Sequence, residues 1–300
     1  MVSDSPVNRR RTLLNTADVL IMPCCFDAFS ARLIEQTGFS LTFMSGFGVS
    51  ATRLALPDTG LISYAEMVDQ GRNICQAVSI PVIGDADTGY GNAVNVKRTV
   101  RGYARAGFAC LMIEDQLSPK RCGHTPGKHV VSRNEALGRI RAAVDAREEG
   151  HDILVMARTD ARATHGLKEA LWRADAFADL GVDIVFVEAP QSERELQLIA
   201  ERAAAPLMAN MIEQGATPLL PPQRLHEMGY KIVAYPLTLL LSAAHAMEQA
   251  LISLRSGITR SAPRQFSRLQ DIVGFAAYDQ EQRRYGGPRH DATIIKSGLE

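Results

Sequence analysis

The sequence predicts an α/β protein, a (β/α)8 barrel of the TIM type, and two observations lead to that prediction. First, eight short segments recur along the 300 residues, and each is almost continuously apolar. Such segments are typical of parallel strands that are covered on both faces. Second, stretches with helical periodicity separate them, and eight strands alternating with helices fit a closed barrel better than an open sheet. No G-x-G-x-x-G motif follows the first segment, which argues against a dinucleotide-binding fold.

The elements follow one another in a regular order. The predicted strands are residues 19–24, 41–45, 81–84, 110–113, 153–157, 184–187, 206–209 and 231–234. Between them, amphipathic helices are predicted where charged and apolar side chains occupy opposite faces, as in residues 95–107, 133–150 and 167–181. Glycines that suit a helix C-terminus precede the strands at Gly38, Gly107, Gly150, Gly181 and Gly229. Two capping boxes are predicted at helix starts, Ser132 with Glu135 and Ser192 with Glu195.

Composition excludes several classes of protein. The 33 basic and 33 acidic residues cancel, so charge gives no reason to expect a nucleic-acid or membrane partner. No apolar run approaches the roughly 20 residues that span a bilayer. We expect one domain over residues 1–300, with a polar N-terminal tail over about residues 1–11 and a C-terminal helical extension over about residues 257–300.

The cysteines indicate a reducing compartment. Five are present, without the paired spacing of a metal site, and no secretory segment follows Met1. We therefore expect reduced thiols in a cytoplasmic protein. Four of them fall within strand or helix patterns and are predicted to be core residues, namely Cys24, Cys25, Cys75 and Cys110.

Polar residues collect where the predicted strands end. In a barrel of this type, the C-terminal ends of the strands carry the active site. Six of the eight predicted strands end in polar groups, more than loop capping alone explains. These groups are Ser45-Gly46-Phe47, Asp85 with Asp87, Glu114, Arg158, Glu188 and Asn210.

The acidic residues among them suggest a metal site. Asp85 and Asp87 are two residues apart, so in extended structure both carboxylates face the same side. Adjacent carboxylates repel unless a cation joins them, and hard oxygen ligands favour Mg²⁺, or Mn²⁺, over Zn²⁺. Asp58 and Glu114 could add ligands directly or through water. The alternative is that these acids cap helices or pair with arginines.

A long loop over residues 117–131 carries a second candidate. It contains Lys120-Arg121-Cys122-Gly123-His124, followed by Pro126 and Gly127. A thiol flanked by three cationic residues is expected to have a depressed pKa and to act as an acid or base. The glycines would let the loop close over a ligand. The alternative is a surface loop with a coincidental thiol.

Together these residues resemble the isocitrate lyase/phosphoenolpyruvate mutase superfamily. The resemblance covers residues 18–256, and its most specific parts are the residues 85–91, DADTGYG, and the residues 120–124, KRCGH. It implies a (β/α)8 barrel whose C-terminal helices are swapped between subunits, in a homotetramer built as a dimer of dimers. It also implies a small-molecule carboxylate substrate.

The resemblance further implies a role for each site residue. Ser45, Gly46 and Phe47 would bind the substrate carboxylate. Asp85 would bind Mg²⁺ directly, and Asp58, Asp87 and Glu114 would bind it through water. Cys122, grouped with Lys120 as catalytic, would protonate the carbanion formed on cleavage. Gly123, His124, Arg158 and Asn210 would hold oxyanions, and Glu188 would orient Arg158 or a water.

The implied reaction is Mg²⁺-dependent cleavage of a carbon–carbon bond in a 2-hydroxy-dicarboxylate, of the 2-alkylmalate or methylisocitrate type. The branch that cleaves methylisocitrate has an arginine where this chain has Leu241, which favours a smaller, more apolar substrate, since an unpaired buried carboxylate is costly. The oxaloacetate hydrolases tend to have serine where Pro236 stands. The alternatives are an enzyme like the carboxyphosphonoenolpyruvate phosphonomutases, an oxaloacetate hydrolase, or a non-enzymatic binding barrel.

Overall fold

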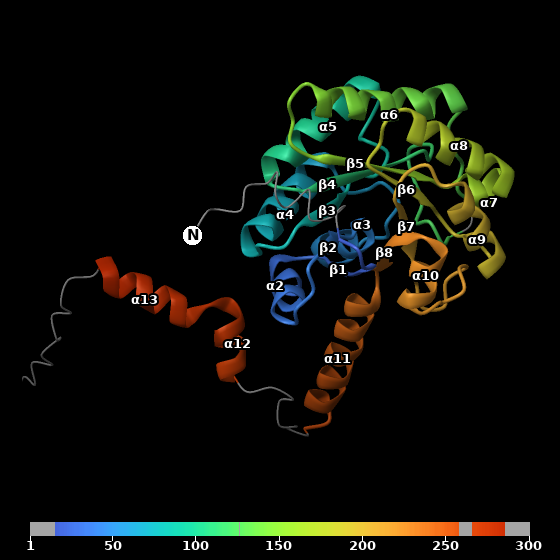
Figure 1. Cartoon of the computed structure of the whole chain (residues 1–300). Coiled ribbons are helices and arrows are strands. Elements are labelled where there is room, and N and C mark those ends of the chain that lie inside the picture. The colour runs from blue at the N-terminus through green and yellow to red at the C-terminus, as the bar shows by residue number, and fades with distance from the viewer. Residues whose placement is uncertain (1–15, 126, 258–265, 286–300) are drawn as a thin grey trace, which may run out of the picture. The chain divides into compact units, whose positions relative to one another are not determined.

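A computed structural model describes residues 16–125, 127–257 and 266–285, and it contains a closed barrel of eight parallel strands (Figure 1). Neighbours in the barrel are neighbours in sequence, and β8 pairs with β1 to close it. The predicted (β/α)8 barrel is therefore confirmed. The strands are β1 (Leu20–Cys25), β2 (Thr42–Met44), β3 (Val82–Asp85), β4 (Cys110–Glu114), β5 (Leu154–Thr159), β6 (Ile184–Val187), β7 (Leu207–Asn210) and β8 (Tyr230–Tyr235).

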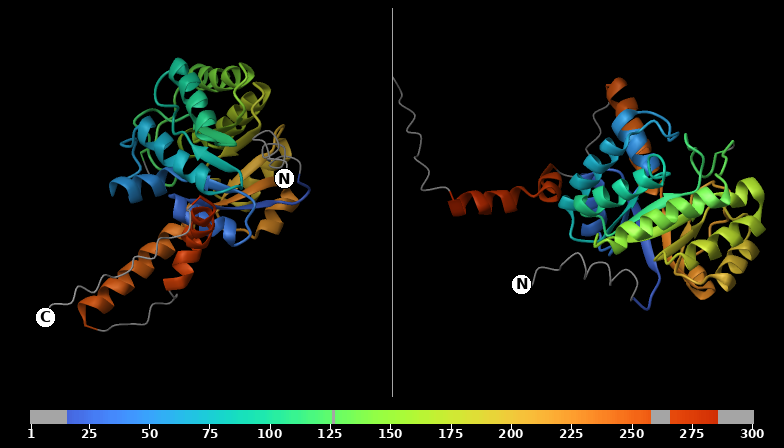
Figure 2. Two further views of the ribbon diagram at one scale, coloured as in Figure 1. Left: turned by 90° about the vertical axis from the view of Figure 1, so that its left-hand side faces the viewer. Right: turned by 90° about the horizontal axis from the view of Figure 1, so that it is seen from above.

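Helices connect the strands and cover the outside of the barrel, as the turned views show (Figure 2). Two short elements, α3 and the π-helix η1, form a tight insertion directly after β2. The helices up to β8 are α2 (Ala28–Gln36), α3 (Gly46–Val49), η1 (Ser50–Leu54), α4 (Tyr64–Ala77), α5 (Ala93–Ala106), α6 (Arg133–Glu148), α7 (Ala161–His165), α8 (Leu167–Asp179), α9 (Glu193–Arg202) and α10 (Pro222–Met228).

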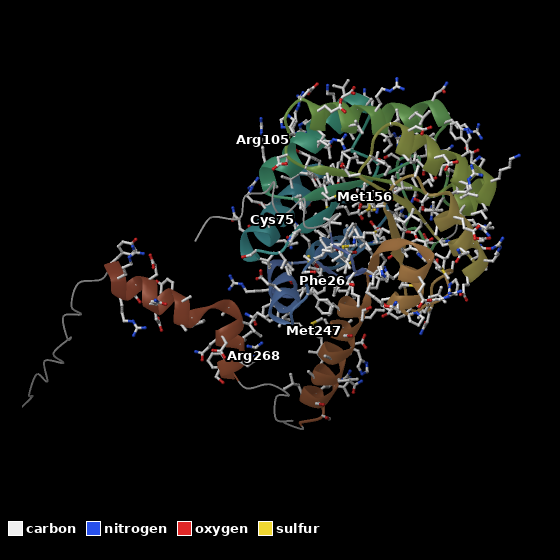
Figure 3. The ribbon with its side chains drawn as sticks, in the orientation of Figure 1. Phe26, Cys75, Arg105, Met156, Met247 and Arg268 are labelled. Atoms are coloured by element: carbon white, nitrogen blue, oxygen red, sulfur yellow. The ribbon has the colours of Figure 1, made fainter. Side chains whose placement is uncertain are left out.

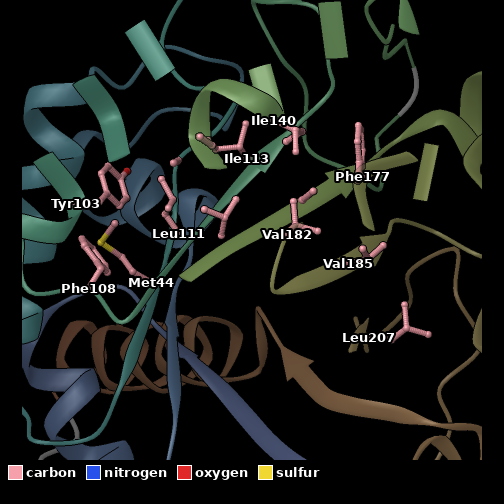
Figure 4. Close-up of a cluster of buried hydrophobic side chains, with 14 of the residues drawn as sticks. Met44, Tyr103, Phe108, Leu111, Ile113, Ile140, Phe177, Val182, Val185 and Leu207 are labelled. Carbon is pink, nitrogen blue, oxygen red and sulfur yellow. The ribbon is translucent and has the colours of Figure 1, made fainter. Parts of the chain in front are cut away.

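The hydrophobic core has two layers because the strands bury both faces. The inner layer fills the barrel, where Met156 is fully buried (Figure 3). The outer layer lies between the strands and the helices and includes Met44, Tyr103, Phe108 and Phe177 (Figure 4). Because protein interiors are close-packed, these two layers restrict the movement of the strands and of the residues at their ends.

The helix ends agree with the predictions in part. All five glycines predicted before strands have positive φ. Ser132 and Ser192 each accept the backbone N–H three residues later, as a helix N-cap does. The full capping boxes predicted there were wrong, because neither glutamate accepts the N–H of its own serine: Glu135 accepts from Arg139, and Glu195 accepts from Arg162 and from the N–H of Gln191.

The chain divides into two compact units, one through Ile252 and one from Ser253 onward. The first contains the barrel. After β8 come α11 (Thr238–Arg255), α12 (Phe266–Val273) and α13 (Phe275–Tyr285). The tail predicted over residues 1–11 and the loop residue Pro126 lie outside the described residues. Among the residues that are described, no helix is both long and apolar enough to cross a membrane.

Candidate active site

The alternation of side chains along each strand brings the predicted polar groups to one place. On β4, Cys110 and Met112 belong to the core inside the barrel, and Glu114 is the next residue with the same parity. Because alternate side chains of a strand share a face, Glu114 also points inward. The same parity places inward the groups that end five other strands, which are Ser45, Asp85, Arg158, Glu188 and Asn210.

All of these groups except Glu114 line a pocket, whose volume is about 590 Å³ with the solvent at its mouth included. Its lining contains most of the predicted site residues, namely Ser45, Phe47, Asp58, Asp85, Lys120, Cys122, Gly123, His124, Arg158, Glu188 and Asn210. Gly46, Asp87 and Glu114 are not part of the lining and lie behind it. Apolar side chains form another part of its wall, and those from the last strands and their loops include Ile212, Ala234, Pro236 and Leu237.

Asp85 is held in place by backbone groups. Its Oδ2 accepts the N–H of Gly46 at 3.2 Å, and its Oδ1 accepts the N–H of Asp87 at 3.0 Å. Burial raises the pKa of Asp85, and the neighbouring charge of Asp87 raises it further. A cation next to Asp85 would offset both effects and favour the ionised carboxylate. The Gly46 N–H, predicted to bind substrate, is thus used in this structure to orient Asp85.

Lys120 of the loop lies against the same group of acids. Its ammonium is 2.5 Å from Asp58 Oδ1 and 2.9 Å from Asp87 Oδ1. Burial opposes the charge of Lys120, but the carboxylates of Asp87, Asp85 and Glu114 outweigh burial and raise its pKa well above the ordinary value. Lys120 is therefore a fixed cation that balances part of the acidic charge.

The acidic residues fit a divalent cation that keeps much of its water. Glu114 Oε1 is buried without a hydrogen-bond partner among the described residues, and burial raises the pKa of Glu114 well above its usual range. Within the part of the chain described, no three His, Cys, Asp or Glu side chains already converge as a complete metal shell. Mg²⁺ does not require one, since it is commonly held by one or two carboxylates together with water and substrate.

Arg158 connects the acids on the other side of the pocket. It donates two hydrogen bonds to Asp160, from Nε at 2.8 Å and from Nη2 at 3.0 Å. Its Nη2 is also 3.1 Å from Glu188 Oε2, and its Nε is 3.4 Å from Glu114. Although burial acts against the ionised form of Glu188, Arg158 and His124 lower its pKa to about 2. Arg158 is thus a fixed positive charge beside the pocket.

The loop that carries Cys122 approaches this arginine closely. A Cβ at Gly123 would lie 2.3 Å from Arg158 Nη2 and 2.6 Å from Glu188 Oε2, so only glycine fits there without displacement. His124 is anchored at both ring nitrogens, since Nε2 is 3.0 Å from Glu188 Oε1 and Nδ1 accepts the N–H of Ala216 at 3.1 Å. The loop therefore lies over the pocket.

The predicted depression of the Cys122 pKa was wrong. Burial raises the pKa of this thiol, and a hydrogen bond from the backbone N–H of His124 opposes only part of the rise. The expected cations do not surround it, because Lys120 turns to Asp58 and His124 turns to Glu188. At neutral pH, Cys122 is therefore a protonated thiol that faces the pocket.

Other residues lie away from their expected positions or went unpredicted. Leu241 is 52% exposed and does not line the pocket. Cys24, predicted as core, is buried but also forms part of the pocket floor. Asp160 and Lys128, to which the sequence analysis gave no role, are buried against Arg158 and the loop. Their signal in the sequence was weak, since each is one charged residue among several.

The sequence of this chain is similar to those of several known enzymes. The model of the family described as "Phosphoenolpyruvate phosphomutase" matches residues 10–255. The chain is 41% identical to 2,3-dimethylmalate lyase of Eubacterium barkeri, over 94% of this chain and 98% of that one. It is 39% identical to the chloroplastic carboxyvinyl-carboxyphosphonate phosphorylmutase of Arabidopsis thaliana, over 96% and 87%. It is also 39% identical to 2-methylisocitrate lyase of Aeropyrum pernix, over 90% and 88%.

Solved structures of enzymes with related sequences have the same fold as this chain. A complex of oxaloacetate acetylhydrolase with 3,3-difluorooxalacetate superimposes with a TM-score of 0.91 at 34% identity, covering 95% of this chain and 98% of that one. A complex of phosphonopyruvate hydrolase with oxalate and Mg²⁺ superimposes with a TM-score of 0.82 at 28% identity, covering 94% and 99%. The same barrel thus carries several reactions on small carboxylates among its relatives.

Proposed function

The chain belongs to the phosphoenolpyruvate phosphomutase family, and from this membership we propose that it is a carbon–carbon bond lyase. Its proposed substrate is a small 2-hydroxy-dicarboxylate, and the products are a 2-oxo acid and a carboxylate. Two of the relatives, 41% and 39% identical over most of their length, are carbon–carbon lyases by name. The observation that carries the proposal is the protonated Cys122 thiol facing the same pocket as Asp85 and Arg158.

This arrangement provides what the cleavage requires. As the C–C bond breaks, the substrate hydroxyl gives its proton to solvent in the open pocket and becomes the carbonyl of the 2-oxo acid. The bonding electrons remain on the carbon next to the second carboxylate. That carbon needs a proton, and Cys122 is a thiol that can supply it and then regain a proton from solvent. Arg158 is a fixed cation that can stabilise the developing oxyanion.

A divalent cation, Mg²⁺ or Mn²⁺, would be held at Asp85, with Asp58, Asp87 and Glu114 around it. When bound, it would supply positive charge to the oxygens of the 2-oxo acid as they form. The residues of the chain prepare that position. Gly46 and Asp87 fix Asp85 by backbone hydrogen bonds, and the orphaned oxygen of Glu114 is available to a bound water.

The apolar part of the pocket favours an alkyl-substituted substrate. Ile212, Pro236 and Leu237 line part of the pocket, and none of them can pair with a third carboxylate. We therefore propose a 2-alkylmalate such as 2,3-dimethylmalate ahead of methylisocitrate, whose extra carboxylate these three side chains could not pair. Leu241 no longer supports this preference, because it does not line the pocket of this chain.

A product assay tests the proposal. The protein would be incubated with Mg²⁺ and with 2,3-dimethylmalate, 2-ethylmalate, methylisocitrate, isocitrate or oxaloacetate, and the 2-oxo acid released would be coupled to lactate dehydrogenase. We expect turnover of an alkylmalate that EDTA abolishes and that Cys122→Ser reduces strongly. Faster turnover of methylisocitrate would contradict the proposed substrate. Release of oxalate from oxaloacetate, or rearrangement of a phosphonate with no lyase activity, would replace the lyase by one of its alternatives.

We also propose that the enzyme is a homotetramer, a dimer of dimers with C-terminal helices exchanged between subunits. Exposed apolar side chains support association. On α11, Met247, Leu251 and Ile252 are each more than half exposed, and in the second unit Phe266 and Tyr278 are too. Light scattering on the full chain should give four times the 32.7 kDa monomer mass, and a monomer would refute the proposal.

A further inference from the structure

Lys128 is a buried cation in the loop, outside the pocket lining. It stands six residues after Cys122, and only 8% of its surface is exposed. Its ammonium donates to the backbone carbonyl of Gly123 and, at 2.9 Å, to Asp160 Oδ1. A charged side chain is rarely buried unless it is paired. Lys128 has two partners, Gly123 in the loop and Asp160 after β5.

The first direction leads to the thiol. The carbonyl of Gly123 and the N–H of His124 belong to one planar peptide unit, so fixing one orients the other. Cys122 directly precedes Gly123 in the chain, and the N–H of His124 partly opposes the rise that burial gives to the pKa of the Cys122 thiol. By holding the Gly123 carbonyl, Lys128 fixes the orientation of the peptide next to Cys122.

The second direction leads to the arginine. Asp160, the partner of Lys128, also accepts both hydrogen bonds of Arg158 that run along its guanidinium edge. Asp160 is itself fixed, since its N–H donates to Asp115 at 2.9 Å and Arg173 in turn donates to Asp115 at 2.9 Å. Through its ion pair with Asp160, Lys128 is therefore held against the residues at the end of β5.

We propose that Lys128 is a positioning residue that sets the Cys122 loop in register with Arg158, through the Gly123 carbonyl on one side and Asp160 on the other. It does not touch substrate. Its effect is to hold the proton donor and the oxyanion-binding cation at a fixed separation. The kinetic consequence rests on the proposed lyase function, whereas the effect on the loop does not.

The test compares Lys128→Met with Lys168→Met. Methionine keeps most of the length of the side chain and removes only the ammonium. Lys168 is exposed on α8 and serves as the matched control. In Lys128→Met we expect kcat on the best substrate to fall about 100-fold with little change in KM, because the reacting groups and not the binding contacts are displaced. Lys168→Met should behave as the wild type.

A second readout follows the loop without any substrate. Arg121 is an exposed trypsin site in the loop, and cleavage after it can be measured by mass spectrometry. We expect cleavage about tenfold faster in Lys128→Met than in the wild type or Lys168→Met, because the loop is released. Lys128→Arg keeps the charge and should restore slow cleavage and most of kcat, which also guards against a Met variant that fails to fold.

The following results would overturn the positioning role of Lys128. Faster cleavage with kcat within threefold of wild type would show that Lys128 only fastens the loop, which overturns the proposal. Unchanged cleavage would overturn it as well, as would Lys128→Arg behaving like Lys128→Met. If the wild type turns over none of the hydroxy acids, the proposed function fails, while the cleavage comparison still tests the contact of Lys128 with the loop.

Discussion

Adding a single methyl group at Gly123 should separate the loop from the arginine beneath it. Gly123 is buried and lacks the positive φ that only glycine adopts with ease, so alanine meets no backbone penalty there. The obstacle is space. The added Cβ would lie 2.3 Å from Arg158 Nη2 and within 3 Å of two atoms of Glu188.

The size of the effect follows from the overlap. Non-bonded heavy atoms settle about 3.5 Å apart, so the loop or the guanidinium must retreat by about 1 Å. Both groups are restrained, Arg158 by Asp160 and the loop by His124 on Glu188. A misplacement of about 1 Å at a reacting centre costs about 100-fold in rate. We therefore expect kcat/KM of Gly123→Ala to fall about 100-fold, which corresponds to about 2.7 kcal/mol.

The coupled assay for 2-oxo acid release measures this directly. Gly138→Ala is the matched control, because a Cβ at this position in α6 meets nothing within 4 Å. It should keep full activity and raise thermal stability slightly, as alanine favours a helix over glycine. If Gly123→Ala keeps activity within threefold of wild type, the loop does not lie against Arg158 during turnover and the reasoning is wrong.

Three other changes test separate parts of the structure. Asp85→Asn should abolish the Mg²⁺-dependent activity and the rise in unfolding temperature that Mg²⁺ gives the wild type, measured by calorimetry; an unchanged Mg²⁺ response would exclude Asp85 as a ligand. The pKa of Glu169 is lowered from 4.5 to about 2, first by its hydrogen bond from Arg133, so its contribution to stability is complete above pH 4.5 and is lost as the pH falls towards 2. Glu169→Gln should therefore lower the unfolding temperature at neutral pH, the deficit should shrink as the pH falls below 4.5, and a deficit that is still undiminished at about pH 2 would contradict this assignment. Gly71→Ala would place a Cβ 2.2 Å from Phe108, so it should destabilise the fold by about 1–2 kcal/mol in urea unfolding, and an unchanged midpoint would show that the ring can move aside.

Most of the barrel was predictable because its signal is local. The segment predicted as residues 184–187 is β6 as the structure has it, and the others differ by one or two residues at an end. The errors lie where polar residues continue a strand. Arg158 and Thr159 belong to β5, although apolar character alone ends that strand earlier. The short α3 and η1 were not foreseen, since four- and five-residue elements have no periodicity to detect.

The membership of the site was predictable, and its electrostatics were not. Strand ends identify Asp85, Glu114 and Arg158 because every parallel strand of a barrel delivers its last side chains to one face. The pKa of Cys122 depends instead on where neighbouring side chains turn, and Lys120 turns away from it to Asp58. The prediction from neighbouring charges in the sequence therefore gave the wrong direction for the pKa shift of Cys122. Lys128 was overlooked for the same reason, since its partner is 32 residues away.

The separate origins of the pocket residues have an evolutionary consequence. Asp85, Glu114, Arg158 and Glu188 come from the ends of β3 to β6, while Ile212, Pro236 and Leu237 follow β7 and β8. Because each group arrives on a separate strand end, substitutions in the apolar wall leave the frame of Asp85 and Arg158 intact. Selection can thus change which substituent is accepted without rebuilding the chemistry. Proteins with this barrel can therefore acquire new carboxylate substrates through changes in single loops. Relatives that share the barrel but catalyse different reactions are consistent with this route.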